Sequence, residues 1–202
     1  MDPLYKIRRA GAGDAEAITA IRNDVIEHST AMWTTKPLTP ADGAAWLAEN
    51  LARDSAYVAE ADGDVVGFAN WAPWRPKDGY RHTVEDSVYL VDGHHRRGVG
   101  AALLRTVIAG ARDNGAHVMM ACIEATNAAS VALHARHGFE VVGTAREVGT
   151  KFGRWLDLTM MSLALLDRES VGVRFPGATG QDCDHRRRLR PGHRLFHRRA
   201  RI

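Results

Sequence analysis

The residues with the clearest chemical potential lie between Glu85 and Leu104. Glu85 supplies a carboxylate that can accept a proton from a reacting group. A basic turn from His94 to Gly100 follows it, with two arginines and two glycines, and apolar residues then recur at helical spacing. Free N–H groups at the start of such a helix, together with its dipole, favour an anion. The segment therefore predicts a phosphate-binding turn close to a proton acceptor.

The glycines of this turn narrow the kinds of nucleotide site that it can form. Gly98 and Gly100 lack a Cβ, so a phosphate can approach the backbone closely. Their spacing fits neither Gly-x-x-x-x-Gly-Lys-Ser/Thr nor Gly-x-Gly-x-x-Gly, so neither a nucleotide triphosphatase nor a dinucleotide-binding fold is supported. An ordinary strand-to-helix loop with solvated charges is the alternative interpretation.

A strand is predicted immediately before the turn. Apolar residues recur on one side of the segment 84–90, whereas Glu85, Ser87 and Tyr89 occupy the other side. Asp86 interrupts the apolar side, and this irregularity predicts a β-bulge.

The other elements alternate between strands and helices. Asp14, Thr39 and Asn127 are the expected N-caps, and Asp62-Gly63 predicts a two-residue hairpin. Their order predicts an α/β fold with a mixed, twisted sheet. The expected strands span 5–9, 56–61, 64–71, 116–123, 139–144 and 156–165, and the expected helices span 14–28, 39–51, 99–111 and 127–138.

Charge and composition divide the chain into two parts. Residues 168–202 hold ten arginines and three acidic residues, whereas the rest carries more acidic than basic groups. We expect one domain over 1–166 and a disordered tail over 167–202, which either binds a polyanion non-specifically or is an extension without function. No apolar run is long enough to span a membrane, and no signal region is visible. With two cysteines, a cytoplasmic location is expected, and Cys122 is predicted to be a core residue.

The turn His95-Arg-Arg-Gly-Val-Gly100 resembles the Gln/Arg-x-x-Gly-x-Gly/Ala acyl-coenzyme A motif of the GNAT N-acetyltransferases. His95 departs from the motif at a position that mainly supplies a backbone amide. The resemblance covers residues 6–165 and is closest to the phosphinothricin and methionine sulfoximine N-acetyltransferase branch. The supporting segments are 29–37, 74–80, 83–89, 127–134, 138–139 and 151–157.

The resemblance implies a GNAT fold in which the two central parallel strands splay apart, acetyl-CoA as co-substrate and no metal. Backbone groups of 88–90 would meet the pantetheine arm, and backbone amides of 97–101 would hold the pyrophosphate. Asn127 is either a helix cap or a donor to the cofactor arm, and Arg96 and Arg97 are either phosphate contacts or solvated surface. The implied cofactor-binding residues are Val88, Tyr89, Leu90, Arg96, Arg97, Gly98, Val99, Gly100, Ala101, Asn127 and Ser130.

For catalysis, the resemblance assigns Glu85 as the general base, with Asp86 as the second candidate. Many members of the family protonate the leaving thiolate with a tyrosine, but the matching residue here is Phe139. His134 is the candidate for that role. Water could replace it, or the thiolate could leave unassisted, since a thiol pKa lies near 8.5. His134 could also be only a packing residue.

The expected acceptor is a small amino acid or analogue with an anionic group, as in detoxification or resistance enzymes. Four residues match the family's acceptor pocket: Trp33, Arg75, Lys77 and Tyr80. Lys36 replaces a commonly acidic position. Another amine, such as a polyamine, an aminoglycoside or a peptide N-terminus, is the second interpretation, and a non-catalytic acyl-CoA-binding module is the third. A homodimer is also expected.

Overall fold

The computed structural model describes residues 5–166. The prediction of a disordered, polyanion-binding tail over 167–202 lies outside the described residues, as does Cys183. Within residues 5–166, no helix is both long enough and apolar enough to cross a membrane.

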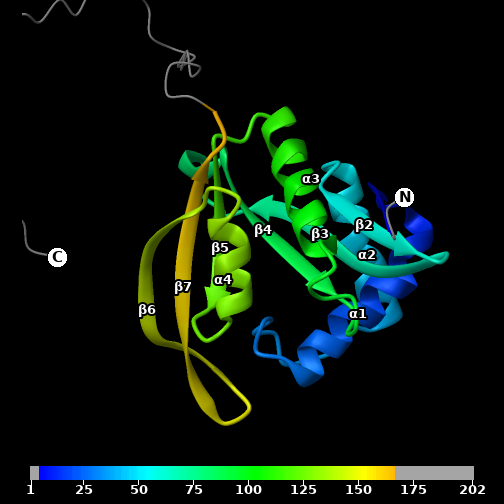
Figure 1. Cartoon of the computed structure of the whole chain (residues 1–202), viewed down its shortest axis with the longest axis horizontal. Helices are drawn as coiled ribbons and strands as arrows, with labels where there is room; N and C mark the ends of the chain where they lie inside the picture. Colours follow the sequence, from blue (N-terminus) through cyan, green and yellow to red (C-terminus); the bar gives the residue numbers. More distant parts are fainter. Residues whose placement is uncertain (1–4, 167–202) are drawn as a thin grey trace, which may run out of the picture. The chain divides into compact units, whose positions relative to one another are not determined.

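A seven-stranded mixed sheet forms the centre of the domain, with the strand order β1-β2-β3-β4-β5-β7-β6. Neighbouring strands are antiparallel except for β4 and β5, which run parallel (Figure 1). The predicted mixed α/β fold is therefore confirmed. The strands are β1 (Lys6–Arg9), β2 (Ala56–Ala61), β3 (Asp64–Pro73), β4 (Thr83–Leu90), β5 (Val118–Glu124), β6 (Glu140–Lys151) and β7 (Arg154–Ala164).

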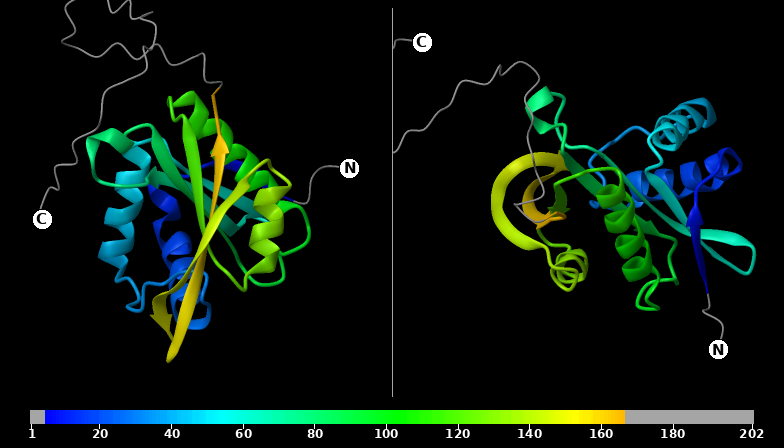
Figure 2. Two further views of the ribbon diagram at one scale, coloured as in Figure 1. Left: turned by 90° about the vertical axis from the view of Figure 1, so that its left-hand side faces the viewer. Right: turned by 90° about the horizontal axis from the view of Figure 1, so that it is seen from above.

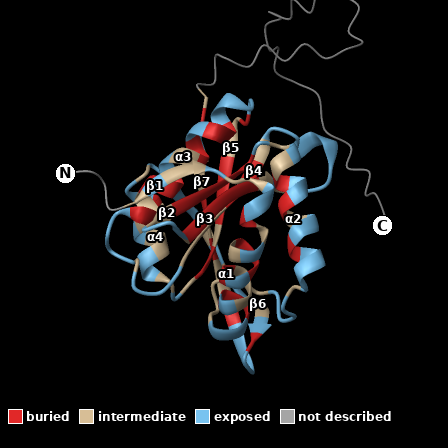
Figure 3. Ribbon diagram, turned by 90° about the vertical axis from the view of Figure 1, so that its right-hand side faces the viewer, coloured by how far each residue is buried: buried red, intermediate tan, exposed pale blue. Residues whose placement is uncertain are grey.

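Helices cover both faces of the sheet. Helices α1 and α2 lie on one face, and α3 and α4 lie on the other (Figure 2). Side chains of α3 form the larger apolar core with β2 to β5, and side chains of α1 and α2 form a second core against β2 and β3. The buried residues accordingly concentrate along the central strands and the inner sides of the helices (Figure 3). The helices are α1 (Ala15–His28), α2 (Pro40–Ala52), α3 (Val99–Asp113) and α4 (Ala128–Ala135), with short 3₁₀ turns at Ala12–Asp14 and Asp78–Tyr80.

Strand β4 carries the predicted proton acceptor, and it is not bulged. It pairs with β3 in one continuous register, from Gly67 opposite Leu90 to Pro73 opposite Val84, so the predicted bulge is wrong. The alternation is nevertheless as expected. Val84 and Asp86 face α3 and α4, where both are buried, whereas Tyr89 packs against the α1 and α2 side.

The predicted splay between the parallel strands is confirmed. Strands β4 and β5 share only three residue pairs, from Thr83 opposite Val118 to Glu85 opposite Met120. Beyond Glu85 the two strands separate, while β5 continues to pair with β7 as far as Glu124. This separation opens a gap in the sheet directly after the carboxylate.

The predicted helix caps are correct at two positions and wrong at the third. The Thr39 side chain accepts a hydrogen bond from the Asp42 amide, and the Asn127 side chain accepts one from the Ser130 amide. Asp14 makes no such bond to α1, because its carboxylate accepts hydrogen bonds from Arg8 and from the Gly11 amide.

The largest differences from the predicted boundaries lie in α4 and in the β6–β7 hairpin, whereas the other boundaries shift by at most two residues. Helix α4 ends at Ala135 rather than at Gly138, which closes the following turn with a φ of 90°. Strands β6 and β7 are longer than predicted and join through Phe152 and Gly153, both at positive φ. Most residues of β6 are exposed on both faces of the strand, so its sequence lacks the regular alternation of apolar and polar residues from which a strand is usually recognised.

Candidate active site

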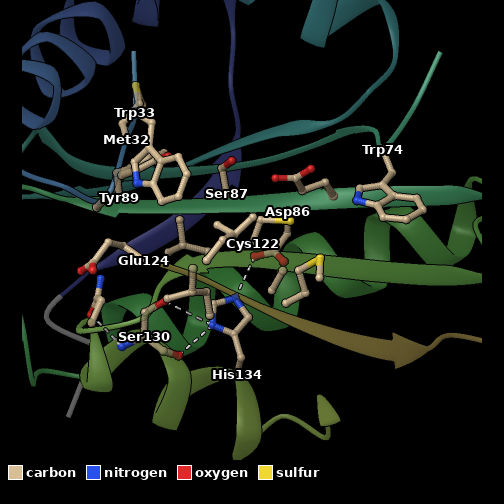
Figure 4. A pocket seen from close by; sticks show the side chains of 18 of the residues that line it. Met32, Trp33, Trp74, Asp86, Ser87, Tyr89, Cys122, Glu124, Ser130 and His134 are labelled. Atoms are coloured by element: carbon tan, nitrogen blue, oxygen red, sulfur yellow. Dashed lines mark hydrogen bonds and ion pairs between the residues drawn. The ribbon is translucent and has the colours of Figure 1, made fainter. Parts of the chain in front are cut away.

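A pocket of about 460 Å³ lies where β4 and β5 separate. Trp33 and Met32 lie at one end of it, Trp74 lies at the other end, and His134 reaches it from α4 (Figure 4). Predicted site residues from four separate stretches of the chain thus meet here. The lining comprises Ala31, Met32, Trp33, Trp74, Arg75, Glu85, Asp86, Ser87, Val88, Tyr89, Ala121, Cys122, Ile123, Glu124, Asn127, Ser130, His134, Leu158 and Met160.

The half-buried carboxylate of Glu85, the predicted proton acceptor, lines this pocket. Burial raises its pKa above the ordinary value, and the negative charge of Asp86 acts in the same direction. The Cys122 thiol and the positive charge of Arg75 oppose the rise. A carboxylate with a raised pKa is a stronger base than a solvated one, as proton transfer from an amine requires.

Asp86 and His134 form a buried pair in the pocket wall. His134 Nε2 lies 3.0 Å from Asp86 Oδ2, and His134 Nδ1 lies 2.8 Å from the carbonyl oxygen of Ser130. Burial by itself would lower the pKa of His134, but the hydrogen bond and charge of Asp86, with the Ser130 carbonyl, outweigh it and raise the pKa. The Phe139 ring packs edge-on against the imidazole, with 5.0 Å between centroids. His134 is therefore held in one orientation.

The start of α4 and the end of β5 each bring one further polar group to the pocket. Asn127 caps the helix through Oδ1, at 3.0 Å from the Ser130 nitrogen, and no residue in the described part of the chain accepts from its Nδ2. Glu124 is buried and accepts hydrogen bonds from the backbone and hydroxyl of Thr126. Both alternatives for Asn127 are thus compatible, since one end caps the helix while the other end can donate into the pocket.

Cys122 lies in the pocket wall and not in the core, so its predicted role is wrong. Its strand splays away from β4, which exposes a side that a fully paired strand would bury. Burial and the nearby charge of Glu85 raise the pKa of the thiol to about 12. The thiol is therefore protonated at neutral pH and is a poor nucleophile.

The predicted acceptor-binding residues separate into two groups. Trp33 and Arg75 line the pocket, and the Arg75 guanidinium lies 4.6 Å from the ring centroid of Trp74. Lys77 and Tyr80 are not part of the lining. Tyr80 contacts the pocket only through its edge-on packing against Trp74, with centroids 5.3 Å apart.

The basic turn before α3 has the geometry of an anion-binding site. Arg96 has a φ of 60°, and Gly98, the N-cap of α3, has a φ of 84°. The first hydrogen bond of the helix runs from the Ala102 amide to the Gly98 carbonyl oxygen. Within residues 5–166, no backbone carbonyl accepts a hydrogen bond from the amides of 97–101. These amides are free to bind phosphate oxygens.

Gly100 offers a test of whether this turn fits a coenzyme A phosphate. Its φ is not positive, and a Cβ built there would lie 3.5 Å from Leu90 and 3.7 Å from Leu133, at ordinary contact distances. Neither backbone strain nor internal packing therefore requires glycine at this position. Close approach of a ligand to the backbone is a further reason for glycine at this position, and it agrees with the phosphate-binding turn that the sequence predicts.

Comparisons with known proteins agree with this arrangement. Residues 18–139 match the acetyltransferase (GNAT) family. The chain belongs to this family.

Two curated relatives and one solved structure illustrate the similarity. An L-methionine sulfoximine/L-methionine sulfone acetyltransferase of Pseudomonas aeruginosa is 46% identical over 162 residues, covering 79% of this chain and 94% of that protein. A phosphinothricin N-acetyltransferase of Alcaligenes faecalis is 38% identical over 154 residues, covering 75% and 78%. A Salmonella typhimurium acetyltransferase, solved with its cofactor acetyl-CoA, has a TM-score of 0.79 at 42% identity, covering 81% and 95%.

Several pocket residues of this GNAT acetyltransferase could not be recognised from the sequence. Trp74 precedes a predicted substrate-binding residue and could have been found from its loop. Cys122, Leu158 and Met160, in contrast, belong to predicted strands, and Glu124 lies just beyond the predicted end of one. They line the pocket only because β5 leaves β4. Among the described residues, no group of three or more His, Cys, Asp or Glu side chains is arranged to hold a metal ion.

Proposed function

We propose that the chain transfers an acetyl group from acetyl-CoA to the α-amino group of a small amino acid or analogue of the methionine sulfoximine, methionine sulfone or phosphinothricin type. The named activities of the relatives at 46% and 38% identity support this substrate class. The half-buried Glu85 carboxylate in the gap between β4 and β5 is the single observation that carries the proposal.

Glu85 acts as the general base. An α-ammonium group cannot attack a thioester until it loses a proton, and the carboxylate accepts that proton directly or through water. The free amine then attacks the thioester carbon. Collapse of the tetrahedral species breaks the carbon–sulfur bond, and the attacking nitrogen releases its second proton to solvent, so a neutral amide forms. Transfer is direct, because the protonated Cys122 thiol is unsuited to form an acyl-enzyme.

The splayed strand and the basic turn bind acetyl-CoA. Beyond Glu85, the β5-facing edge of β4 has no strand partner, so backbone groups around Val88, Tyr89 and Leu90 can bond the pantetheine arm and polarise the thioester oxygen. The amides of 97–101 hold the pyrophosphate. Arg96 and Arg97 add positive charge beside it. At the start of α4, Asn127 Nδ2 and Ser130 complete the binding site for the pantetheine arm of acetyl-CoA.

His134 supplies the proton that the coenzyme A thiolate requires. It lines the pocket on the α4 side, and its raised pKa keeps the ring protonated closer to neutral pH than that of an ordinary histidine. Transfer of one proton from His134 to sulfur leaves coenzyme A as a neutral thiol. The proton accepted by Glu85 then returns to solvent, and His134 is reprotonated from solvent.

Arg75 holds the acceptor's carboxylate. It is the only lysine or arginine that lines the pocket within residues 5–166, and its fork can form two parallel bonds to a carboxylate. Trp33 walls the opposite end of the pocket. Outside the lining, the positive charge of Lys77 attracts the anionic acceptor, and Tyr80 supports the pocket wall by packing against Trp74. The acceptor's amine then lies between Arg75 and the thioester, within reach of Glu85.

A thiol-release assay tests the acceptor class. We expect turnover with methionine sulfoximine, methionine sulfone or phosphinothricin, and much weaker turnover with polyamines, aminoglycosides or a peptide N-terminus. Preferential use of a polyamine would contradict the role of Arg75. Binding of acetyl-CoA without release of thiol across the whole panel would instead favour a non-catalytic acyl-CoA-binding module.

The homodimer and the cytoplasmic location remain predictions. Large apolar side chains are exposed on the β6–β7 hairpin, and this surface supports association with a second copy, since monomers rarely leave such groups together in solvent. Sedimentation equilibrium measures the oligomeric state. The exposed residues are Val141, Val142, Val148, Phe152 and Trp155.

A further inference from the structure

The buried lysine at the end of β6 has no acidic partner among the described residues. Lys151 is 4% exposed, and its ammonium group forms no salt bridge within residues 5–166. Lysine is almost never fully buried unless its charge is compensated. An uncompensated charge would strongly oppose folding, so the surroundings of Lys151 must stabilise the ammonium group in another way.

Three backbone carbonyls provide that stabilisation. The Nζ group donates to the carbonyl oxygens of Ser29 and Met32, each at 2.6 Å, and to that of Val25 at 3.4 Å. These acceptors match the three donors of an ammonium group. Two of the carbonyls lie at the C-terminal end of α1, where the helix dipole also favours a cation.

The segment bonded in this way forms one wall of the pocket. Ala31, Met32 and Trp33 all line it, and Trp33 lies at the end opposite to Trp74 (Figure 4). The two short bonds of Lys151 bracket the first part of this segment, from Ser29 to Met32. The β6–β7 hairpin therefore fixes a wall that belongs, in sequence, to the loop between α1 and α2.

A second, independent contact joins the same strand to the same segment. The ring of Trp33 lies directly against the backbone of Gly149, so closely that a Cβ at this position would overlap the indole. Gly143, on the same strand, has open space where its Cβ would be. Only the glycine that faces Trp33 is thus required by packing.

We propose that Lys151 and Gly149 position the segment 29–33 as the wall that receives the acceptor amine, and that Lys151 is thereby a positioning residue for acceptor binding. The inference rests on the proposed function, because it assigns this wall to the acceptor rather than to acetyl-CoA. The proposed cofactor side of the pocket, formed by β4 and α4, makes none of these contacts.

Two substitutions test the proposal by different routes. Lys151→Met removes the donors but keeps an unbranched apolar stem, and Gly149→Ala displaces the Trp33 ring without changing Lys151. We expect each to raise the KM for methionine sulfone at least about tenfold while the KM for acetyl-CoA changes by less than about twofold. Hydrogen–deuterium exchange should rise in 29–33 in both variants.

The matched controls lie on the same strand. Thr150→Ala changes an exposed residue between the two positions, and Gly143→Ala adds a Cβ in open space, so both should leave the two KM values unchanged. Equal rises in both KM values, or unchanged kinetics with raised exchange in 29–33, would overturn the proposal. If Lys151→Met does not fold, Gly149→Ala carries the test.

The exchange measurement separates this inference from the proposed function. A wild-type protein that acetylates none of the amino acid analogues would contradict the proposed function. Raised exchange in 29–33 in both variants would still show that β6 fixes the segment, and unchanged exchange would overturn that contact role.

Discussion

His134 and Asp86 share a buried hydrogen bond of 3.0 Å, and the other ring nitrogen of His134 faces the carbonyl oxygen of Ser130 at 2.8 Å. A carbonyl oxygen can only accept, so Nδ1 must carry a hydrogen atom. Nε2 faces a carboxylate, so the hydrogen between them belongs either to the ring or to Asp86. In both forms the pair holds one removable proton beside the pocket, on the face of β4 opposite to Glu85.

Asp86→Asn tests how this proton is held. Without the carboxylate, burial dominates, and the pKa of His134 should fall. If His134 is the general acid, turnover requires its protonated form, so the alkaline limb of kcat should move to lower pH. Nuclear magnetic resonance of the imidazole C–H groups measures the shift directly, and the exposed Asp92→Asn serves as control. An unchanged alkaline limb in an Asp86→Asn protein with a lowered His134 pKa would remove His134 from the mechanism.

Glu85→Gln tests the general base. Glutamine cannot accept the ammonium proton, so kcat should fall by about 10²- to 10⁴-fold. In the wild type, kcat/KM should decrease as the pH falls through the raised pKa of Glu85, because only the carboxylate form is active. The variant should lack this acidic limb and should still bind acetyl-CoA by isothermal calorimetry. Wild-type turnover in the variant would refute the assignment.

The same substitution should increase stability at neutral pH. A raised pKa means that folded Glu85 binds its proton more tightly than unfolded Glu85, so the free energy of unfolding falls as the pH rises from the unfolded pKa through the folded one. Glu85→Gln removes this penalty. Urea denaturation at pH 7.5 should therefore show a higher midpoint for the variant, and the difference should shrink in acid. Exposed Glu49→Gln is the control, with no expected change in midpoint.

Much of this site could be predicted from the sequence, because several of its signals are local. The turn before α3, the alternation along β4 and the Asn127 cap each depend on a few adjacent residues. Asp86 is the instructive case. Its position on an apolar side predicted a bulge, but the structure keeps the strand regular and stabilises the carboxylate with His134, 48 residues away. Partners so distant leave no local signal.

The pocket wall formed by residues 29–33 was harder to predict for the same reason. Lys151 bonds carbonyls more than a hundred residues earlier in the chain, and Gly149 contacts Trp33 across an equally long separation. Cys122 was predicted to be a core residue because its strand has the sequence pattern of a buried strand. That pattern cannot show that the neighbouring strand β4 separates from β5 partway along its length. Only the paired strands reveal which residues border the gap.

Cys122→Ala distinguishes direct transfer from an acyl-enzyme route. The pKa of about 12 leaves the thiol protonated, so we expect the variant to keep kcat within about threefold of the wild type. Mass spectrometry of the wild type mixed with acetyl-CoA alone should show no acetylated protein. A burst of coenzyme A release without acceptor, abolished in Cys122→Ala, would instead establish a covalent intermediate.

Gly100→Ala tests the proposed pyrophosphate site, because it should weaken the binding of acetyl-CoA without lowering the stability of the protein. A methyl group there meets Leu90 and Leu133 at ordinary distances, and alanine within a helix is favoured over glycine by about 1 kcal/mol, so Tm should stay constant or rise. The same methyl group would lie where the backbone meets the phosphates, so the KM for acetyl-CoA should rise about tenfold. The acceptor's KM should not change. Gly13→Ala, which adds a Cβ in open space in the 3₁₀ turn before α1, controls for the glycine substitution. An acetyl-CoA KM equal to that of the wild type would show that coenzyme A does not approach α3 at this residue.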